Sequence, residues 1–394
     1  MKEINNIEWL HGSMEAFTQR PLVPFADEAI EELDALSKAL MRDPQSRLYP
    51  DVVTFAFFCR RGNLMKLREQ SVVSFQPSVI RLGRGTIFHI APSNVPVNFA
   101  YSIVAGVLAG NTNVVRVSQK QFPQVDIIVK HMREIEMKRL SVVRYPHESN
   151  ANEVFSAMCD VRVIWGGDAT IATIRQNAIP PRAFDICFAD RYSIAAINSD
   201  ELNTDKLNSE NLKQLAERFY NDTYLFDQNA CSAPHLVVWT GNHVEGAKKL
   251  FWNAVQRVTE QKYQFQDVMA VDKLTAFYKQ ACAMPTHDEE TKNNILRRVE
   301  IDALPQDIDS FRCAGGYFTE YTAQSLDEIA PIVNEKYQTL AYYGFTQQEL
   351  SDFVLRNRLT GIDRIVPFGE TTAFSLTWDG MNLIERMSRV VDII

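Results

Sequence analysis

The sequence predicts an α/β protein with two doubly wound parallel-sheet domains and a helical N-terminal region. Short β-rich segments alternate with helical segments over residues 86–177, and a second alternation of the same kind begins after Asp200. Such alternation is typical of parallel strands joined by right-handed crossovers. The length of 394 residues also suits more than one domain.

The first 80 residues are expected to form a helical region that packs on the domain that follows. Residues 25–42 carry apolar side chains at helical spacing, and the Asp43-Pro44 pair ends that pattern. Residues 52–58 (VVTFAFF) are apolar throughout, so they fit either a strand or a buried helix.

The first α/β domain is expected over residues 81–205. Its strands and helices are predicted to alternate over residues 86–90, 99–109, 113–117, 123–138, 141–146, 151–158, 161–165 and 169–177. In doubly wound sheets, ligands bind at the carboxyl ends of the strands. Two loops fall there, APSNVP after the first strand and GGDAT after the last.

The second α/β domain is expected over residues 206–365, and residues 366–394 are expected to return to the first domain. Strands are predicted at residues 235–239, 298–302 and 315–320. Helices are predicted at residues 212–224, 243–261, 267–282, 325–334 and 346–355. The segment FDQNACSAP (226–234) is expected to be a loop, because turn-forming residues dominate it.

Composition excludes several classes of function. A formal net charge of −8 argues against nucleic acid or anionic membranes as general partners. The longest apolar stretch, residues 99–110, is shorter than the ~20 residues of a spanning helix, and no signal peptide is recognisable at the N-terminus. Six cysteines without a CxxC pair predict neither a metal site nor disulfides, so a cytoplasmic protein with reduced thiols is expected.

Cys231 and Asn94 are the residues whose local sequence suggests chemistry. Cys231 lies among turn formers and small residues, where a thiol can be exposed and receive backbone N–H groups, yet an inert loop cysteine has the same local sequence. Asn94, in the turn PSNVP, could donate to an oxyanion or simply cap the helix that follows. His89 and His235, flanked by apolar β residues, are interpreted as packed histidines.

Four motifs in order give a more specific indication. They are PSNVP (92–96) before an apolar helix, GNTNVVR (110–116), WGG (165–167) and DQNACSAP (227–234). Together these motifs resemble the LuxC-type acyl-CoA reductases, a branch of the aldehyde dehydrogenase superfamily. The similarity covers residues 80–240 well and extends thinly to RIVPFGE (364–370). It implies an aldehyde dehydrogenase-like fold, a dinucleotide-binding first domain and a thiol-bearing second domain.

The resemblance assigns roles to individual residues. Cys231 takes the place of the nucleophile, and Asn94, with the backbone N–H of Cys231, takes that of the oxyanion hole. Arg116 stands where the superfamily has a ribose-binding lysine, and Gln119 stands where many NAD-dependent members have an acidic residue. A carboxylate would repel a 2′-phosphate, whereas this basic and neutral pair would accept one, so NADP(H) is predicted. Further cofactor-binding positions implied by the resemblance are Ser118, Gly166, Gly167, Asp168 and Glu370.

One departure from the superfamily sets the predicted reaction. Aldehyde-oxidising members carry a glutamate that activates water at a strand end, and the corresponding CFADRYS (187–193) has none. The resemblance therefore implies NADPH-dependent reduction of an acyl-CoA or acyl-protein thioester to an aldehyde, through a cysteinyl thioester. The alternatives are an aldehyde or acyl-phosphate dehydrogenase and a non-catalytic scaffolding member. A homo-oligomer is expected, and an acyl-donating protein is a further candidate partner. His235 could raise the thiolate fraction of Cys231.

Overall fold

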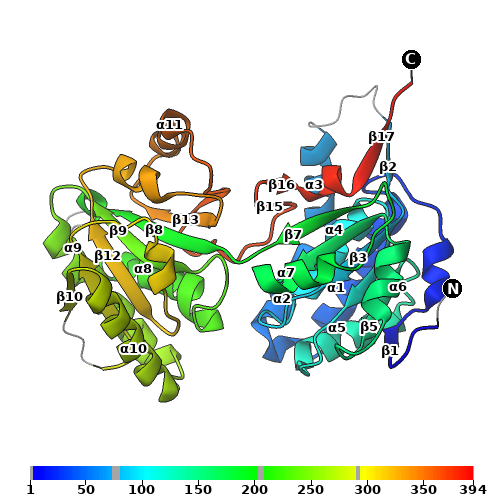
Figure 1. Cartoon of the computed structure of the whole chain (residues 1–394), viewed down its shortest axis with the longest axis horizontal. Helices are drawn as coiled ribbons and strands as arrows, with labels where there is room; N and C mark the ends of the chain where they lie inside the picture. Colours follow the sequence, from blue (N-terminus) through cyan, green and yellow to red (C-terminus); the bar gives the residue numbers. More distant parts are fainter. Residues whose placement is uncertain (1–2, 73–79, 203–207, 290–292, 394) are drawn as a thin grey trace. The chain divides into compact units, whose positions relative to one another are not determined.

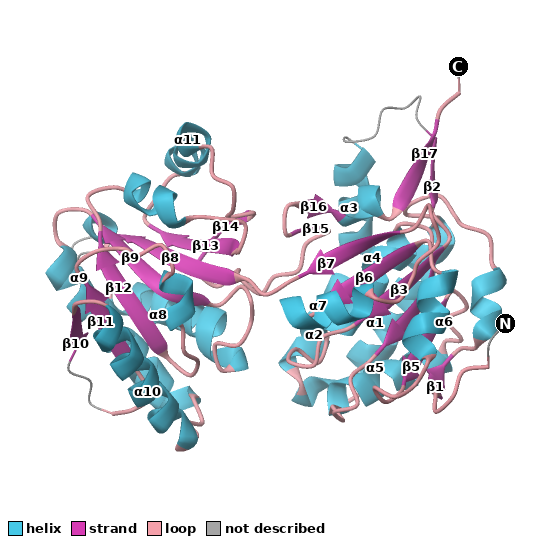
Figure 2. Ribbon diagram, in the orientation of Figure 1, coloured by secondary structure: helices cyan, strands magenta, loops and turns pink. Residues whose placement is uncertain are grey.

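A computed structural model describes residues 3–72, 80–202, 208–289 and 293–393. The chain divides into two compact units, one made of Met1–Ala189 with Phe374–Ile394, and the other of Asp190–Ala373. Figure 1 shows the path of the chain, and Figure 2 its helices and strands. Each unit is an α/β structure with its own sheet and its own cores, and each is described by itself.

The first unit is built on a six-stranded sheet. Its strands, in spatial order, are β1 (Glu8–His11), β5 (Leu140–Arg144), β4 (Thr112–Arg116), β3 (Thr86–Ile90), β6 (Val161–Trp165) and β7 (Phe184–Phe188). The edge strand β1 is antiparallel to β5, and the other pairs are parallel. All five residues of β3 are buried, as expected for a parallel strand covered on both faces.

Helices cover both faces of this sheet and create two cores. They are α1 (Asp27–Arg42), α2 (Pro50–Phe58), α3 (Arg61–Val72), α4 (Asn98–Leu108), α5 (Pro123–Glu134), α6 (Ala151–Met158), α7 (Asp168–Arg175) and α12 (Leu383–Arg386), with short 3-10 turns at Met14–Thr18 and Ser46–Leu48. Successive strand residues face opposite sides. Ile87 therefore packs in the core beneath α1, α2, α4 and α5, and Phe88 packs in the core with α6.

Two small ladders complete the first unit. Strands β2 (Ile80–Gly83) and β17 (Ser388–Val391) pair antiparallel, and β15 (Thr377–Trp378) forms a hairpin with β16 (Met381–Asn382). Residues 374–393 therefore belong to the first unit.

The second unit is built on a seven-stranded sheet. Its strands, in spatial order, are β10 (Thr286–Glu289), β11 (Arg297–Ile301), β12 (Tyr317–Thr322), β9 (Pro234–Thr240), β8 (Tyr192–Asn198), β13 (Tyr337–Tyr343) and β14 (Arg364–Pro367). Only the β10–β11 pair among these described strands is antiparallel. Along β8, Ile197 packs in one core and Ile194 in the other, so this sheet too is covered on both faces.

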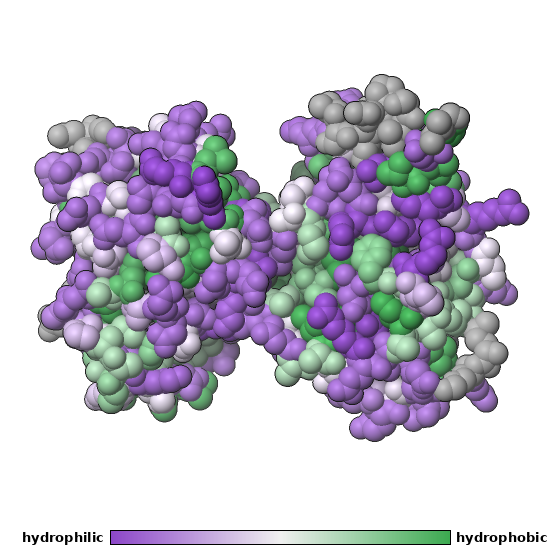
Figure 3. Space-filling view, turned by 45° about the horizontal axis from the view of Figure 1, so that its top comes forward, coloured by the Kyte–Doolittle hydropathy of each residue, from purple (hydrophilic) through white to green (hydrophobic). Residues whose placement is uncertain are grey.

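In the described part of the second unit, four α-helices and four 3-10 turns surround the sheet. They are α8 (Ser209–Thr223), α9 (Val244–Lys262), α10 (Val268–Ala283) and α11 (Gln347–Asn357), with 3-10 turns at Ser199–Glu201, Tyr224–Phe226, Ile308–Phe311 and Leu326–Ile332. No helix in the described part of the chain is both long and apolar enough to cross a membrane. Figure 3 shows a largely hydrophilic surface on one face, interrupted by hydrophobic patches.

Residues 52–58, which fitted either a strand or a buried helix, lie in helix α2, with Val52, Phe55 and Ala56 buried at helical spacing. Other segments differ from their expected structure. The segment expected as a helix at residues 325–334 is a 3-10 turn that contains Pro331, a residue that cannot donate to a helical hydrogen bond. Strands β7, β8 and β13 fall where the sequence pattern predicted none.

The division between the units also falls earlier than expected. The sequence pattern placed residues up to 205 in the first domain, whereas the structure divides after Ala189. The reason is β8, which pairs in parallel with β9 and β13 and so lies inside the second sheet. At the other end, the second unit extends to Ala373, beyond the expected boundary at residue 365.

Candidate active site

The predicted cofactor residues of the first unit lie at one edge of its sheet. The chain runs outward from β3 through β4 to β5, and then returns to β6 on the other side of β3. Loops after β3 and β6 therefore diverge at a topological switch point, where doubly wound sheets bind their ligands. The turn that contains Asn94 follows β3, Arg116 ends β4, and Gly166 follows β6.

Asn94 lies in the exposed turn between β3 and α4. The first helical residue is Asn98, and the N-cap position is Val97, whose side chain has no hydrogen-bonding atom. Asn94 therefore does not occupy the cap position of this helix. A small hollow at this edge is lined by Pro92 and Pro96 of the turn, by Phe99 of α4 and Val125 of α5, and by Ser118 after β4.

Arg116 projects from the end of β4 against an aromatic ring. Its guanidinium carbon lies 5.1 Å from the ring centre of Tyr145, a contact that holds the charge in place. The Arg116 Nε is buried and has no hydrogen-bond partner within the described residues. An unsatisfied buried donor is costly unless a ligand pairs with it. Beyond it, Ser118 Oγ accepts from the backbone N–H of Lys120 at 3.1 Å, and Gln119 is exposed.

Gly166, Gly167 and Asp168 form the turn that leads from β6 into α7. The N–H of Gly166 donates to the carbonyl of Phe188 at 3.1 Å, which ties this turn to the end of β7. A Cβ added at Gly167 would meet no atom within 4 Å, so the space before the helix is open. Gly167 is the N-cap of α7, and the N–H groups of the first turn are suited to an anion.

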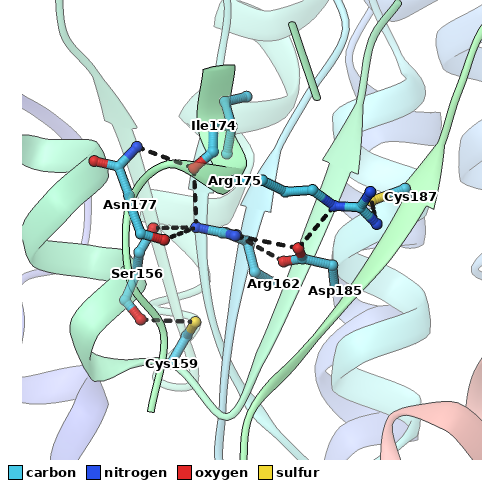
Figure 4. Close-up of polar contacts among 8 residues, drawn as sticks. All are labelled: Ser156, Cys159, Arg162, Ile174, Arg175, Asn177, Asp185 and Cys187. Carbon is cyan, nitrogen blue, oxygen red and sulfur yellow. Dashed lines mark hydrogen bonds and ion pairs between the residues drawn. The ribbon is translucent and has the colours of Figure 1, made fainter. Parts of the chain in front are cut away.

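A buried arginine anchors the other end of α7 (Figure 4). Arg162, which is 1% exposed, donates from Nη1 to the carbonyls of Ile174 and Asn177 at 3.2 and 2.9 Å. Its Nε and Nη2 pair with both oxygens of Asp185 on β7, at 2.8 and 3.2 Å. Arg175 binds the same carboxylate at 3.2 Å. Asp185 is thus a structural ion-pair residue that fixes α7 to the sheet.

A second buried network lies under the switch point. His89 Nδ1 lies 2.8 Å from Ser102 Oγ, and its Nε2 lies 3.0 Å from Asn113 Oδ1. Trp165 Nε1 donates to the same Ser102 Oγ at 3.1 Å. Burial lowers the pKa of His89 to about 4, so the ring is neutral near pH 7. His89 is therefore a packed histidine bound to side chains.

In the second unit, Cys231 lies in a loop that we define as the thiol loop, residues 227–233. Gln228 organises this loop from a position that is 1% exposed. Its Nε2 donates to the carbonyls of Pro234 and Tyr317 at 2.8 and 3.0 Å. Its Oε1 accepts from the N–H groups of Gly316 and Tyr317 at 2.9 and 3.1 Å. The amide is fully satisfied and ties the loop to the amino ends of β9 and β12.

The backbone of the thiol loop is unusual at its first two residues. Asp227 and Gln228 have φ values of 51° and 61°, in the left-handed region that residues with a Cβ rarely adopt. Tyr263 donates its hydroxyl to Asp227 Oδ1 at 2.7 Å, and the N–H of Gly315 donates to the Asp227 carbonyl at 3.0 Å. These tertiary contacts sustain a backbone conformation that the local sequence does not favour.

Cys231 itself is half-buried, and both its carbonyl and its sulfur accept hydrogen bonds. Its carbonyl accepts from Ser193 Oγ at 2.7 Å, and its sulfur accepts from Gln338 Nε2 at 3.4 Å. Ser193 and Gln338 are 0% exposed, and they lie at the amino ends of β8 and β13. The thiol thus sits at the amino ends of the strands, whereas the predicted ligand turns of the first unit follow carboxyl ends.

His235, four residues after the thiol, faces a different part of the protein. Its Nδ1 lies 3.2 Å from the carbonyl of Cys313, and its ring stacks on Tyr192 with centres 5.7 Å apart. Burial, followed by the charge of Arg312, lowers the pKa of His235 to about 4. The ring is uncharged near pH 7, so it supplies no positive charge to the Cys231 thiolate.

Glu370 follows β14 in an exposed turn. The backbone of that turn is bound by Asp222, which accepts from the N–H groups of Gly369 and Thr371 at 2.7 and 3.0 Å. Burial raises the pKa of Asp222 to about 6. The carbonyl of Glu370 accepts from Arg364 at 3.2 Å. Glu370 therefore follows the carboxyl end of a strand, whereas Cys231 precedes the amino end of another.

The segment CFADRYS spans the passage from β7 to β8. Asp190, its one carboxylate, is bound by Arg312 at 2.6 Å, and Arg191 pairs with Asp363. The one carboxylate of this passage is therefore engaged in an ion pair.

The fold is that of the aldehyde dehydrogenases. A 1-pyrroline-5-carboxylate dehydrogenase from Thermus thermophilus superposes with a TM-score of 0.66 at 13% identity, over 97% of this chain and 84% of that one. A Thermus 1-pyrroline-5-carboxylate dehydrogenase solved with bound NAD gives 0.64 at 12% identity, over 97% and 84% of the two chains. Lactaldehyde dehydrogenase from Escherichia coli gives 0.65 at 12% identity, over 92% and 85%.

Within this fold class, residues 67–390 match the model of the family described as acyl-CoA reductase (LuxC), and the chain belongs to that family. Two relatives, from Vibrio harveyi and Photorhabdus laumondii, are each called long-chain acyl-protein thioester reductase. Each is 23% identical, over 78% and 77% of this chain respectively. The chain spans 64% and 62% of their lengths.

Sequence reasoning missed the residues that position the thiol. Gln228 was interpreted only as a turn former, and Ser193 and Gln338 lie on strands that were not predicted. The available signal was a polar residue inside an otherwise apolar segment, as in SIAAIN (193–198) and QTLAYY (338–343). Buried polar side chains are generally hydrogen-bonded to something specific, and here two of them bind Cys231.

Proposed function

We propose that this protein reduces an acyl thioester, either an acyl-CoA or an acyl-protein, to an aldehyde with NADPH as the hydride donor. The observation that supports this most is the setting of Cys231. The side chain is half-buried, its carbonyl is fixed by Ser193, and its sulfur receives a hydrogen bond from Gln338. A thiol fixed in this way and partly open to solvent is suited to nucleophilic attack.

The chemistry on this chain begins with the Cys231 thiolate. Its sulfur attacks the acyl carbonyl, and the C–S bond to the donor thiol breaks, leaving an acyl group on Cys231 and a free donor thiolate. The proposal gives the Asn94 carboxamide and the Cys231 N–H the role of oxyanion donors during attack and reduction. Removal of one such donor in acyl-transfer enzymes costs about 3 kcal/mol of transition-state stabilisation.

The first unit fits a nicotinamide dinucleotide. Arg116 offers a buried Nε donor without a partner in the described residues, and Gln119, three positions later in the sequence, brings no negative charge. Open space before Gly167 and the first N–H groups of α7 would receive the pyrophosphate. When bound, the cofactor supplies a hydride to the acyl carbon. Ser118, Gly166 and Asp168 complete the proposed contacts, and Glu370 is retained as a proposed ribose ligand.

The absence of a free carboxylate in CFADRYS supports reduction over oxidation. Asp190 is ion-paired with Arg312, so this segment supplies no unpaired carboxylate to activate a water molecule for hydrolysis of a cysteinyl thioester. After reduction, the thiohemiacetal collapses: its oxygen reforms a carbonyl, the electron pair of the C–S bond returns to Cys231, and the aldehyde leaves.

The direct test is mass spectrometry of the protein after incubation with acyl-CoAs of several chain lengths in the absence of NADPH. An acyl adduct on the Cys231 peptide, absent from Cys231→Ala, is the expected result, and NADPH should then release aldehyde. Conversion of free aldehyde to acid without a thiol acceptor would instead identify an aldehyde dehydrogenase. A wild-type protein that neither accepts acyl groups nor consumes NADPH would identify a scaffolding member.

We further propose that the protein forms a homo-oligomer and acts in the cytoplasm. None of the six cysteines, which all lie within the described residues, forms a disulfide, as is usual in a reducing compartment. Ile80 and Val390, on the paired strands β2 and β17, are 45% and 50% exposed. Exposed apolar edge strands are common sites of association between chains. An acyl-donating partner protein, suggested by the names of the Vibrio and Photorhabdus relatives, is the proposed source of an acyl-protein substrate.

A further inference from the structure

We infer that Gln338 is a further catalytic residue, whose side-chain amide stabilises the Cys231 thiolate both as attacking nucleophile and as leaving group. This inference deepens the proposed function and rests on Cys231 being its nucleophile. The Gln338 Nε2 lies 3.4 Å from Cys231 Sγ, and Gln338 is 0% exposed. A buried carboxamide aimed at a half-exposed sulfur is a specific arrangement, because burial of this polar group requires hydrogen-bond partners.

The strand that carries Gln338 is distorted at this residue. The register between β13 and β8 shifts between Tyr337 and Leu340, and the register between β8 and β9 shifts at Ser193. Irregularities of this kind redirect individual side chains and are frequent beside active sites. Here the two irregularities coincide at the residues that contact Cys231.

Neighbouring groups fix the orientation of the Gln338 amide. The Thr339 hydroxyl donates to Gln338 Oε1 at 3.4 Å, while Gln338 Nε2 donates to the sulfur. Ser193 Oγ accepts from the N–H of Thr339 at 3.2 Å while it donates to the Cys231 carbonyl. The same pair of strand ends therefore holds both the backbone and the sulfur of Cys231.

The chemistry needs such a donor because the nearest histidine in sequence is uncharged. His235 is neutral near pH 7 and faces the carbonyl of Cys313. An N–H donor favours a thiolate over a thiol and binds a thioester sulfur only weakly. Gln338 thus lowers the pKa of Cys231 before attack. When the thiohemiacetal collapses, it stabilises the electron pair that returns to sulfur from the broken C–S bond.

The test measures the ionisation of Cys231 without any substrate. Alkylation of the full-length protein by iodoacetamide is followed from pH 6 to 10 by peptide mass spectrometry, and the inflection of the Cys231 rate gives its pKa. We expect Gln338→Met to raise this inflection by roughly one pH unit, because the donor is lost. Gln338→Glu, of nearly equal size, should raise it by roughly two units, because a carboxylate opposes the thiolate.

Cys282, which is exposed on α10, provides an internal reference in every digest. A general loosening of the fold would instead show as faster alkylation of the half-buried Cys313 relative to Cys282. Thr339→Val is a milder variant that keeps Gln338, and a smaller rise is expected from it. Superimposable Cys231 profiles in wild type, Gln338→Glu and Thr339→Val would overturn the inference.

The failure of this inference can be told apart from failure of the proposed function. Acylation of wild-type Cys231 by acyl-CoA, together with profiles that do not respond to Gln338, would overturn the role of Gln338 alone. Full turnover by Cys231→Ala would overturn the nucleophile role of Cys231, and with it this inference. For a catalytic Gln338, kcat in Gln338→Met should fall at pH 7 and recover partly at pH 9, where the thiol ionises without help.

Discussion

The two units present their candidate residues in contrasting ways. In the first unit, the turns bearing Asn94 and Gly166 follow the carboxyl ends of adjacent parallel strands, and local sequence defines them. In the second unit, Cys231 precedes the amino end of β9, in a loop whose shape depends on buried Gln228. The cofactor positions follow from the topology of the sheet, whereas the position of the thiol depends on side-chain hydrogen bonds made across the fold.

The largest effect is expected from loss of the side chain that shapes the thiol loop. Gln228→Ala removes the partners of four backbone groups, and we expect the free energy of unfolding to fall by roughly 3–4 kcal/mol. Gln119→Ala, at an exposed position of the first unit, is the matched control and should change it by less than about 0.5 kcal/mol. Urea unfolding of both variants measures the difference. Equal stabilities would show that the thiol loop is set by local sequence after all.

A pH-dependent loss of stability is expected from the buried histidine of the first unit. Burial lowers the pKa of His89 from 6.5 to about 4, so the unfolded chain binds a proton that the folded chain does not. The stabilising contribution of neutral His89 is complete above pH 6.5 and is lost as the pH falls toward 4. By pH 4.5 the loss should reach about 2–3 kcal/mol.

The comparison with His89→Gln isolates this contribution. The variant should be less stable than wild type at pH 7 and should lose less of its remaining stability between pH 7 and 4.5. Identical slopes of unfolding free energy against pH in the two proteins would mean that His89 is not the titrating group.

Substitution of Asn94 tests whether the turn after β3 takes part in the chemistry proposed for Cys231. Asn94→Ala should lower kcat by about 100-fold through loss of an oxyanion donor. The pH profile of Cys231 alkylation should stay as in wild type, because an oxyanion donor acts on the acyl oxygen and not on the free thiolate. An unchanged kcat would restrict Asn94 to a structural part in its turn.

The smallest effect is expected at the proposed 2′-phosphate contact. Gln119→Glu should raise the KM for NADPH relative to NADH by roughly tenfold, since two like charges a few ångströms apart in water repel by about 1 kcal/mol. Steady-state kinetics with both cofactors measures the ratio. A preference for NADH in the wild-type protein would overturn the proposed choice of NADP(H).

Much of the fold could be predicted from the sequence. The alternation of β-rich and helical segments gave the first sheet apart from its edge strands β1 and β7, because apolar strands such as VRVIW and amphipathic helices have clear periodicities. The strands of the second sheet were harder to predict from the sequence. The inner strands β8 and β13 carry buried polar residues at their second positions, Ser193 and Gln338, that interrupt the apolar pattern.

The residues of the candidate site also differ in whether the sequence could predict them. Cys231 and Asn94 could be selected from their motifs, and the two turns at the switch point could be placed at one sheet edge. The residues that hold the thiol could not be selected, because Ser193 and Gln338 are 38 and 107 residues away from it in sequence. Only the pairing of β8 with β9 and β13 brings them to Cys231.

The covalent step tests the central claim most directly. Full-length protein is incubated with a labelled acyl-CoA without NADPH, digested, and examined for label on the peptide that contains Cys231. The proposed function predicts one acyl group per chain on Cys231, released as aldehyde when NADPH is added, and none on Cys231→Ala. Label that is absent from Cys231 while the wild-type protein still turns over acyl-CoA would contradict it.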